Sequence, residues 1–472
     1  MRTRSWLGVV LVLAVSACAP EEADPQSART SAVIANRNLD VLFMVDNSSS
    51  MRLQQANLTT NFPMFMDALK ALPGGLPNIH VAVVSSDMGA GDGNIAGCNS
   101  TGGGNGVFQY TARGTCTATN LQAGNTYISN VGGQANYTGD ISNVFTCIAT
   151  LGEQGCGFEH QFASVLRALG ADGKPAPLEN QGFLRPDALL AIVMLTNEDD
   201  CSSRGPANLY DATSNLLLSS ELGPPSNFRC NEFGHLCDRV PPVREAPNDD
   251  VTAMVPQMNC TSAECDGRLI PVAEFVARIR ALKSAPNSEI LVAALAGPST
   301  PYTVTWKNPS TADTSCGASS CPWPIIAHSC MAADGSFADP SIRINEWVAA
   351  FGANGIASSI CDANFGPTLQ QIAGRIGTLL SAGGGTGGPP GSIPSCAASG
   401  TGGTGGTGGT GGSAGTTGAG GATTDAGADA GKPSSKNGGG CQAGGAPANV
   451  WGLAVAGAVT ALLARRRRGR RR

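Results

Sequence analysis

The sequence predicts an α/β domain of the doubly wound kind, with a mostly parallel sheet and helices on both of its faces. Unbroken apolar runs indicate buried strands at residues 39–45, 79–85, 189–195 and 290–295. Between and after these runs, apolar residues recur at helical spacing around 58–69, 158–169, 272–282 and 369–379. Continuous apolar strands that alternate with amphipathic helices are typical of a parallel sheet buried on both faces.

The large apolar residues concentrate in residues 38–380, which we therefore assign to one domain. Two long polar stretches interrupt it, near 89–139 and 201–267, and we interpret them as disulfide-rich loop insertions. Because each follows a predicted strand, both are expected over the same end of the sheet. Residues 19–37 predict a flexible stalk, and the Gly- and Thr-rich residues 381–440 predict a disordered spacer.

Residues 1–18 have the features of an export signal: Arg2 and Arg4, then a short apolar run that is too short to span a bilayer. The run ends in Val15-Ser16-Ala17-Cys18, which resembles a lipobox. That resemblance implies a lipoprotein signal peptide and a lipidated Cys18 at the mature amino terminus. An ordinary signal cleaved near Ala17 or Ala19 is the alternative.

Residues 441–472 have the features of a membrane-anchoring tail. Residues 446–464 are uncharged and reach the length of one transmembrane helix, and seven arginines follow between 465 and 472. Cys441, the span and the Arg cluster together resemble the myxobacterial sorting tail called MYXO-CTERM. The resemblance implies processing near Cys441 and display at the cell surface. Both termini therefore predict a lipoprotein of the cell envelope, at the outer membrane or cell surface, attached through lipid at Cys18 and through this tail.

The charge balance of the displayed part is acidic. The whole chain has 30 basic and 35 acidic side chains, a formal charge of −5. Without Arg2, Arg4 and the seven tail arginines, the chain has 21 basic and 35 acidic side chains, a net charge of −14. Such a surface argues against nucleic acid as a partner and favours cations or basic partners.

The chain contains 16 cysteines, and setting aside Cys18 and Cys441 leaves an even number in an exported protein. Disulfides are their expected use. Structural zinc is the alternative, at Cys260-x4-Cys265 or at His328 with Cys330, and an oxidising compartment disfavours it. Short spacings make local disulfides plausible, although spacing leaves the connectivity open: Cys98–Cys116, Cys147–Cys156, Cys260–Cys265 and Cys316–Cys321.

The first predicted strand ends in Val45-Asp46-Asn47-Ser48-Ser49-Ser50-Met51, directly before the first helix. Asp46, Ser48 and Ser50 thus lie at the carboxyl end of a strand, where open α/β sheets bind ligands. Hard divalent cations prefer oxygen ligands, and Mg²⁺ takes few carboxylates and leaves positions for other groups. Capping of the following helix is the alternative, but a cap explains one residue and not three at alternate positions.

Asp46-x-Ser48-x-Ser50 after an apolar strand resembles the first loop of the metal ion-dependent adhesion site of von Willebrand factor A (vWFA) domains. A later strand ends Leu195-Thr196-Asn197-Glu198-Asp199-Asp200, where that family has Leu-Thr-Asp. The resemblance implies Mg²⁺, or Mn²⁺ or Ca²⁺, and a protein partner that contributes an acidic side chain. The implied ligands are Asp46, Ser48, Ser50, Glu159, Asn197 and Glu198.

The chain departs from the family pattern at two positions. Asn197 stands where the family has Asp, so that a second carboxylate would come from Glu198, Asp199 or Asp200, or be absent. The family's loop threonine is missing before the middle helix, where Glu159 is the substitute oxygen ligand. Alternatively, Glu198–Asp200 form a solvated acidic turn or a second cation loop, and Glu159 and His160 are exposed residues of a helical first turn.

The chain shows no convincing catalytic motif: it lacks a P-loop lysine, a dinucleotide fingerprint and a metalloprotease His pair. We therefore predict a non-enzymatic, adhesion-type surface lipoprotein that binds a protein partner with the help of a divalent cation. A structural envelope protein with a degenerate metal site is the first alternative. A metal-dependent hydrolase, with its cation held by Asp46, Glu159 and Glu198–Asp200, is a weaker one.

Overall fold

The computed structural model describes residues 36–90, 98, 102–203, 209–210, 218–263, 268–307 and 322–382. The chain divides into two compact units, Met1–Ser399 and Gly400–Arg472, and every described residue belongs to the first. Cys18, Cys441 and the predicted span at 446–464 lie outside the described residues. Within those residues, no helix combines the length and the apolar character needed to cross a membrane.

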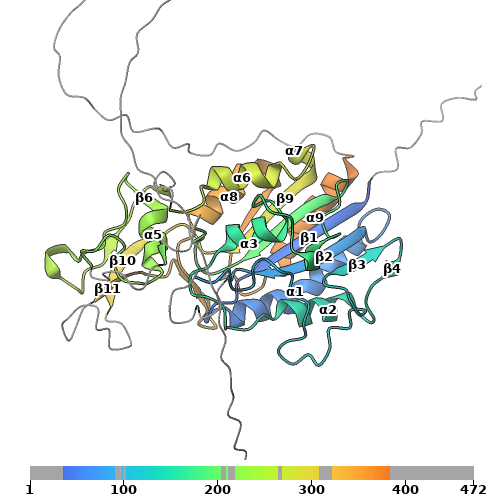
Figure 1. The fold of residues 1–472 in the computed structure, drawn as a ribbon, viewed down its shortest axis with the longest axis horizontal. Coiled ribbons are helices and arrows are strands. Elements are labelled where there is room, and N and C mark those ends of the chain that lie inside the picture. Colours follow the sequence, from blue (N-terminus) through green and yellow to red (C-terminus); the bar gives the residue numbers. More distant parts are fainter. Residues whose placement is uncertain are drawn as a thin grey trace, which may run out of the picture. The chain divides into compact units, whose positions relative to one another are not determined.

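A seven-stranded sheet forms the centre of the first unit, in the order β14-β9-β5-β1-β2-β3-β4 (Figure 1). The strands from β14 to β2 are parallel, while β3 and β4 add an antiparallel edge. The predicted mostly parallel sheet is therefore confirmed, and β14 and the β3–β4 hairpin are additions. Neither has a long apolar run, because both lie toward sheet edges. The strands are β1 Asn38–Val45, β2 Asn78–Ser85, β3 Ile128–Val131, β4 Gln134–Ala135, β5 Leu189–Leu195, β9 Ile290–Ala296 and β14 Gly355–Ser359.

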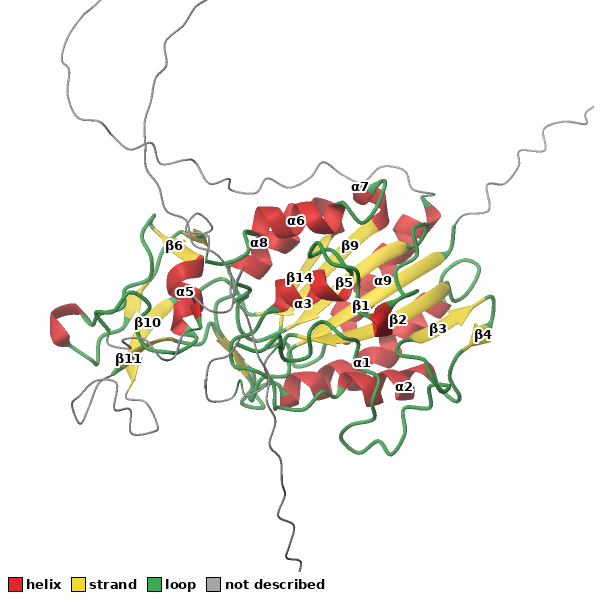
Figure 2. Ribbon diagram, in the orientation of Figure 1, coloured by secondary structure: helices red, strands yellow, loops and turns green. Residues whose placement is uncertain are grey.

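Helices cover both faces of this sheet (Figure 2). Alternate side chains of β1 explain why, since Phe43 belongs to one apolar core and its neighbours Leu42 and Met44 belong to the other. On the Phe43 face lie α1 Arg52–Lys70, α2 Ile141–Ala149 and α9 Gly366–Ser381. On the Leu42 face lie α3 Gln161–Ala168, α6 Val272–Arg280 and α8 Arg343–Ala350, and the short α7 Pro286–Glu289 leads into β9.

Aromatic side chains fill both cores. Phe43 of β1 lies 4.8 Å from Phe145 and 5.8 Å from Phe62, measured between ring centroids. On the opposite face, Phe162 of α3 stacks on Phe275 of α6 with ring centroids 4.1 Å apart. Burial of such rings contributes much of the apolar area that stabilises a domain of this size.

The predicted insertion at 201–267 is not a plain loop. It contributes to an accessory lobe, which we define as the elements α5, β6, β7, β8, β10 and β11, and Figure 1 shows its labelled elements to the left of the main sheet. Sequence periodicity does not reveal the lobe, because its strands are short and come from two distant segments. Its elements are α5 Phe228–Gly234, β6 His235–Cys237, β7 Val255–Pro256, β8 Cys260–Ser262, β10 Thr303–Lys307 and β11 Trp323–Ile326, and the small β12 Cys330–Met331 and β13 Phe337–Ala338 pair separately.

The two predicted insertions meet in one apolar cluster, which contains Ala90 and Cys98 of the first and Leu209 and Cys230 of the second. Parts of both insertions thus lie together, while β3 of the first insertion pairs with Ile79–Val81 at the beginning of β2. The local pairs Cys98–Cys116, Cys147–Cys156 and Cys260–Cys265 are wrong, because folding brings together cysteines from different loops. The observed bonds are Cys98–Cys156, Cys116–Cys147, Cys201–Cys230, Cys237–Cys260 and Cys330–Cys361.

These bonds also exclude the two zinc alternatives. Cys260 is bonded to Cys237, and Cys330 is bonded to Cys361, so neither sulfur is available as a zinc thiolate. Cys265 and the predicted pair Cys316–Cys321 lie outside the described residues.

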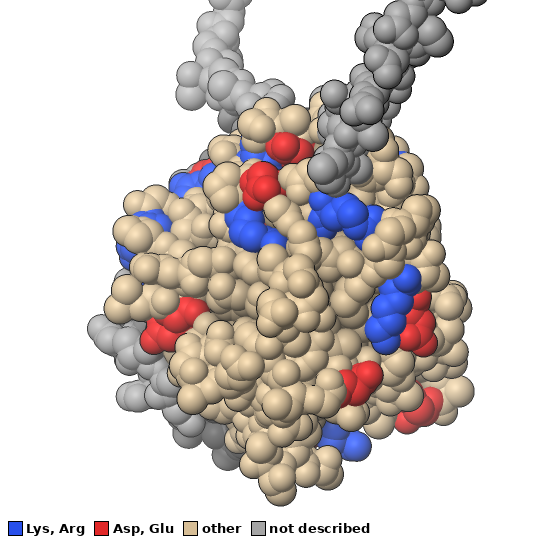
Figure 3. Space-filling model, turned by 90° about the vertical axis from the view of Figure 1, so that its right-hand side faces the viewer, with Lys and Arg blue, Asp and Glu red and all other residues tan. Residues whose placement is uncertain are grey.

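Charged side chains are sparse on the face drawn in Figure 3, where both signs are interspersed. Among the described residues drawn there, Lys and Arg form no broad basic patch of the kind that binds nucleic acid.

Non-reducing peptide mapping tests the disulfide pattern. We expect linked peptides that contain Cys98 with Cys156 and Cys116 with Cys147, because the fold places those sulfurs together. The reduced and alkylated protein is the control. Linked peptides joining Cys98 to Cys116 would contradict the arrangement of both loops.

Candidate functional site

The candidate site lies at the carboxyl ends of the central strands, which we call the carboxyl edge of the sheet, at the point where the strand order reverses. In the sheet, β1 lies between β2 and β5. The chain passes from β1 to β2 on one side of β1 and later adds β5 on the other side. Asp46 follows β1 and Thr196 follows β5, and the Asp46 amide donates to the Leu195 carbonyl across 2.9 Å. Open α/β sheets bind ligands at such a switch point.

Asp46 is fully buried, and three donors approach its carboxylate. The Ser48 amide donates to Oδ1 at 2.8 Å, the Thr196 hydroxyl to Oδ2 at 2.7 Å, and the Ser86 hydroxyl to Oδ1 at 3.4 Å. Burial raises the pKa of Asp46, and these hydrogen bonds oppose that rise. The helix-cap alternative is wrong, because Met51, and not Asp46 or a serine, occupies the cap position of α1.

Glu159 and Glu198 form a carboxyl pair beside Asp46. The two carboxyl groups influence each other's pKa, because like charges this close disfavour the ionisation of both. Burial, the charge of Glu198 and the charge of Asp46 raise the pKa of Glu159 well above its usual range. Burial and the charge of Asp339 raise the pKa of Glu198 to about 7. The alternative of exposed residues in a helical first turn is wrong, since Glu159 and His160 are only 1% and 4% exposed.

Asn197 connects the loop after β5 to the loop after β1. Its side-chain nitrogen donates to the Ser50 hydroxyl at 2.9 Å and to the Phe337 carbonyl at 3.2 Å. The structure thus brings to one edge all six residues that the sequence singled out. We call them the oxygen cluster: Asp46, Ser48, Ser50, Glu159, Asn197 and Glu198.

Several buried oxygens at this edge have no regular hydrogen-bond partner in the described part of the chain. Glu159 Oε1 and Asn197 Oδ1 are two of them, and the Ser48 hydroxyl faces Asp46 without a hydrogen bond of regular geometry. Asn47 Oδ1 and Gln161 Oε1 belong to the same group. A buried polar atom left without a partner costs about 1–3 kcal/mol, so such atoms are rare unless something else binds them.

The character of these atoms fits a hard divalent cation. They are carboxylate, hydroxyl and amide oxygens, which Mg²⁺, Mn²⁺ and Ca²⁺ accept and which suit zinc less well. Across the described part of the chain, no three His, Cys, Asp or Glu side chains gather into a metal-binding group. Hydroxyl and amide oxygens would therefore have to complete any cation shell at this edge.

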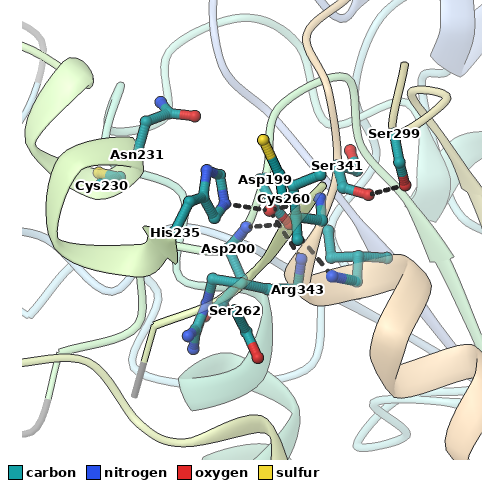
Figure 4. A network of polar contacts seen from close by, with 12 residues as sticks. Asp199, Asp200, Cys230, Asn231, His235, Cys260, Ser262, Ser299, Ser341 and Arg343 are labelled. Atoms are coloured by element: carbon teal, nitrogen blue, oxygen red, sulfur yellow. Dashed lines mark hydrogen bonds and ion pairs between the residues drawn. The ribbon is translucent and has the colours of Figure 1, made fainter. Parts of the chain in front are cut away.

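Asp199 does not act as a second carboxylate of the cation site, which the sequence had offered as one possibility. Its carboxylate accepts the amides of Ile342 and Arg343 on Oδ2 and that of Ile344 on Oδ1, at 2.7–3.1 Å, which caps α8. Figure 4 shows His235 on its other side, 2.8 Å from Oδ2. Through its second ring nitrogen, His235 contacts the hydroxyl of Tyr302, which lies just before β10. Asp199 thereby joins the sheet edge, α8 and the accessory lobe.

Asp200 caps a second helix. Its Oδ1 accepts the Phe162 amide of α3 at 2.8 Å, and its Oδ2 lies 3.2 Å from Arg343, both side chains being fully buried. Burial raises the pKa of Asp200, and Arg343 opposes that rise. Asp199 and Asp200 are therefore neither a solvated acidic turn nor a second cation loop. Their oxygens already serve backbone amides, a histidine and an arginine.

The sequence did not identify some residues of the site. Asn227, in the insertion, donates to Glu198 Oε2 at 3.0 Å, and its sequence context offers no signal of that role. Gln161 donates to the Thr196 hydroxyl at 2.9 Å and so supports Asp46 indirectly. Thr196 did carry a signal, since it is a polar residue directly after a fully buried strand.

Replacing Asp199 should destabilise the protein strongly. We expect Asp199→Ala to lower the free energy of unfolding by about 3 kcal/mol or more, since several buried donors lose their acceptor. Burial favours a higher pKa for Asp199, but His235 and the α8 amides outweigh it and lower that pKa below 3.8. The stabilisation is therefore fully present above pH 3.8 and is lost as the pH falls below it.

Urea unfolding at pH 7 and near pH 3 measures this difference. Asp67→Ala is the matched control, because Asp67 is an exposed aspartate of α1 paired with Lys70, and its loss should change stability by under about 0.5 kcal/mol. Equal effects of the two variants at pH 7 would contradict the bridging role of Asp199.

No family model matches the sequence, and no curated protein matches it significantly. Structural similarity exists to the pilus adhesin SpaC from Lactobacillus rhamnosus GG in its open conformation, with 10% identity, a TM-score of 0.28, and coverage of 72% of this chain and 30% of that one. The pilus adhesin RrgA from Streptococcus pneumoniae gives 9% identity, a TM-score of 0.21, and coverage of 55% and 39%. The chain thus spans well under two thirds of either adhesin, and TM-scores this low carry no argument about its fold or function.

Proposed function

We propose that this protein is a non-enzymatic surface protein that binds a protein partner with the help of a divalent cation, as vWFA domains do. The observation that supports the proposal most is the set of buried, unpartnered oxygens in and around the oxygen cluster. Mg²⁺ is the proposed cation, with Mn²⁺ and Ca²⁺ as substitutes, because all three accept such ligands.

Each residue of the oxygen cluster has a distinct role in this proposal. Asp46 provides the most deeply buried carboxylate, oriented by Thr196 and the Ser48 amide. Ser48 and Ser50 provide hydroxyl oxygens, and the hydrogen bond from Asn197 holds Ser50 in place. A bound cation would supply a concentrated positive charge that attracts an acidic side chain of the partner.

A proton held by the pair Glu159 and Glu198 would matter for that attraction. While it is retained, the pair and Asp46 together carry two negative charges, which one divalent cation balances. The repulsion that an incoming carboxylate meets is then small. Ser50 and Glu198 are only half-buried, whereas Asp46, Glu159 and Asn197 are buried. The partner would therefore approach from the side of Ser50 and Glu198.

The proposal places this domain on the outside of the cell envelope. Lipid at Cys18 and the tail beginning at Cys441 would attach it to the outer membrane, and residues 381–440 would act as a spacer. The support is the sequence pattern of the two termini.

A purely structural role in the envelope is a second candidate, and the Asn197 side chain favours it. Its nitrogen already links Ser50 to the Phe337 carbonyl, so these loops are joined by direct hydrogen bonds. Under this candidate, divalent cations would leave the stability of the protein unchanged.

Thermal unfolding with and without cations distinguishes the two candidates. We expect Mg²⁺ or Mn²⁺ to raise the melting temperature relative to EDTA, since a ligand at 100 times its Kd stabilises by about 2.7 kcal/mol. Asp46→Ala should abolish the shift, while Asp67→Ala, at an exposed position of α1, should preserve it. Identical melts of the wild type in EDTA and in excess Mn²⁺ would refute the cation-binding proposal.

Ser48→Ala provides an independent test. In EDTA, we expect this variant to unfold within about 0.5 kcal/mol of the wild type, because the hydroxyl that it removes makes no regular hydrogen bond. In saturating Mn²⁺ it should show a smaller stabilisation than the wild type. Calorimetric titration with Mn²⁺ measures the affinity directly. A variant that is destabilised in EDTA yet keeps full Mn²⁺ affinity would assign Ser48 a structural role only.

A further inference from the structure

We propose a second binding site, separate from the oxygen cluster, for a small anionic molecule with an apolar body. The site is a cavity of about 430 Å³ beside α3 and α6. Ligand pockets in proteins commonly have about 300–1,000 Å³ and combine apolar walls with a few polar groups. This cavity has that composition.

His160 provides the polar group of the cavity. The residue is 4% exposed, and its ring nitrogen Nε2 is buried with no hydrogen-bond partner among the residues that the structure describes. An imidazole ring nitrogen can donate or accept one hydrogen bond. Because His160 lines the cavity, a polar atom of a ligand bound there can satisfy this nitrogen.

Apolar surfaces surround this nitrogen. The Tyr210 ring lies 5.0 Å from the His160 ring, and its hydroxyl is already bonded to the Cys201 carbonyl, so Tyr210 offers its ring face. Leu166 of α3 and Ile270, just before α6, extend the apolar wall. A flat or aliphatic body would bury apolar area here.

The charges around the cavity favour an anion. Arg167 is 3.9 Å from Asp172, and Arg278 is 2.7 Å from Glu274, so each arginine has an acidic partner. Lys174, which also lines the cavity, forms no ion pair with any residue that the structure describes. Among the described lining residues, Lys174 is thus a cation without a countercharge, at an exposed position where a carboxylate or sulfonate of a ligand can reach it.

The cavity and the oxygen cluster are independent sites that share a short piece of backbone. Glu159 belongs to the oxygen cluster, and its neighbour His160 lines the cavity. No residue of the oxygen cluster contributes to the cavity lining. Binding in the cavity does not require a cation, so either proposal can fail while the other holds.

Fluorescence titration with 1-anilinonaphthalene-8-sulfonate, an aromatic sulfonate, tests the cavity in the intact protein in EDTA. We expect saturable binding at one site. Ala163→Trp should weaken it at least about tenfold, because Ala163 is a half-buried residue of the cavity wall that the larger ring would fill. The matched control is Ala277→Trp, at an exposed position of α6, which should bind within about twofold of the wild type.

Lys174→Gln tests the anion preference and should leave folding intact, because Lys174 is exposed. It should weaken binding about threefold or more, while Lys70→Gln on α1 should not. Undiminished binding by Ala163→Trp, or binding without saturation, would show that the probe adheres elsewhere, for example at exposed Met254 and Met258, and would overturn the proposal. Undiminished binding by Lys174→Gln would overturn the anionic character of the ligand.

Discussion

The buried carboxylates of Asp199 and Asp200 hold the carboxyl edge of this sheet together, and the site depends on them. Asp199 caps α8 and contacts His235 of the accessory lobe, while Asp200 caps α3 and pairs with Arg343. Charges this deeply buried are tolerated only when hydrogen bonds and an opposite charge compensate their lost hydration. Both residues have such compensation, and as a result two helices and the lobe are positioned against the loop that follows β5.

The oxygen cluster lies on the other side of the same loop. Because Asp200 holds the first turn of α3, Glu159 is placed directly before that helix and toward Asp46 and Glu198. Four consecutive residues after β5 thus have two different structural roles. Asn197 and Glu198 face the cluster, and Asp199 and Asp200 stabilise the surrounding framework. This division explains why an acidic run that looks like a solvated turn is mostly buried.

The accessory lobe adds a contact to Glu198 that neither the loop after β1 nor the loop after β5 can make. Asn227 reaches Glu198 from the insertion, and the disulfide Cys201–Cys230 ties that insertion to the end of β5. A disulfide limits the conformations open to the unfolded chain, and one placed here also limits how far Asn227 can move from Glu198. The surface available to a partner around Ser50 and Glu198 is therefore set partly by a segment without a regular sequence pattern.

Local sequence patterns are enough to predict the parallel sheet, the helices on both faces and the loop of Asp46, Ser48 and Ser50. These follow from local signals: unbroken apolar runs, helical periodicity and polar residues at a strand end. Only the folded chain reveals the disulfide partners, the accessory lobe and the separate roles of Glu198, Asp199 and Asp200. Those features depend on which distant loops meet at the carboxyl ends of the strands. The sequence of an acidic run is the same whether its carboxylates bind a helix terminus, an arginine or water. The cavity beside His160 belongs to the same class, since its walls come from α3, from the residues before α6 and from the second insertion.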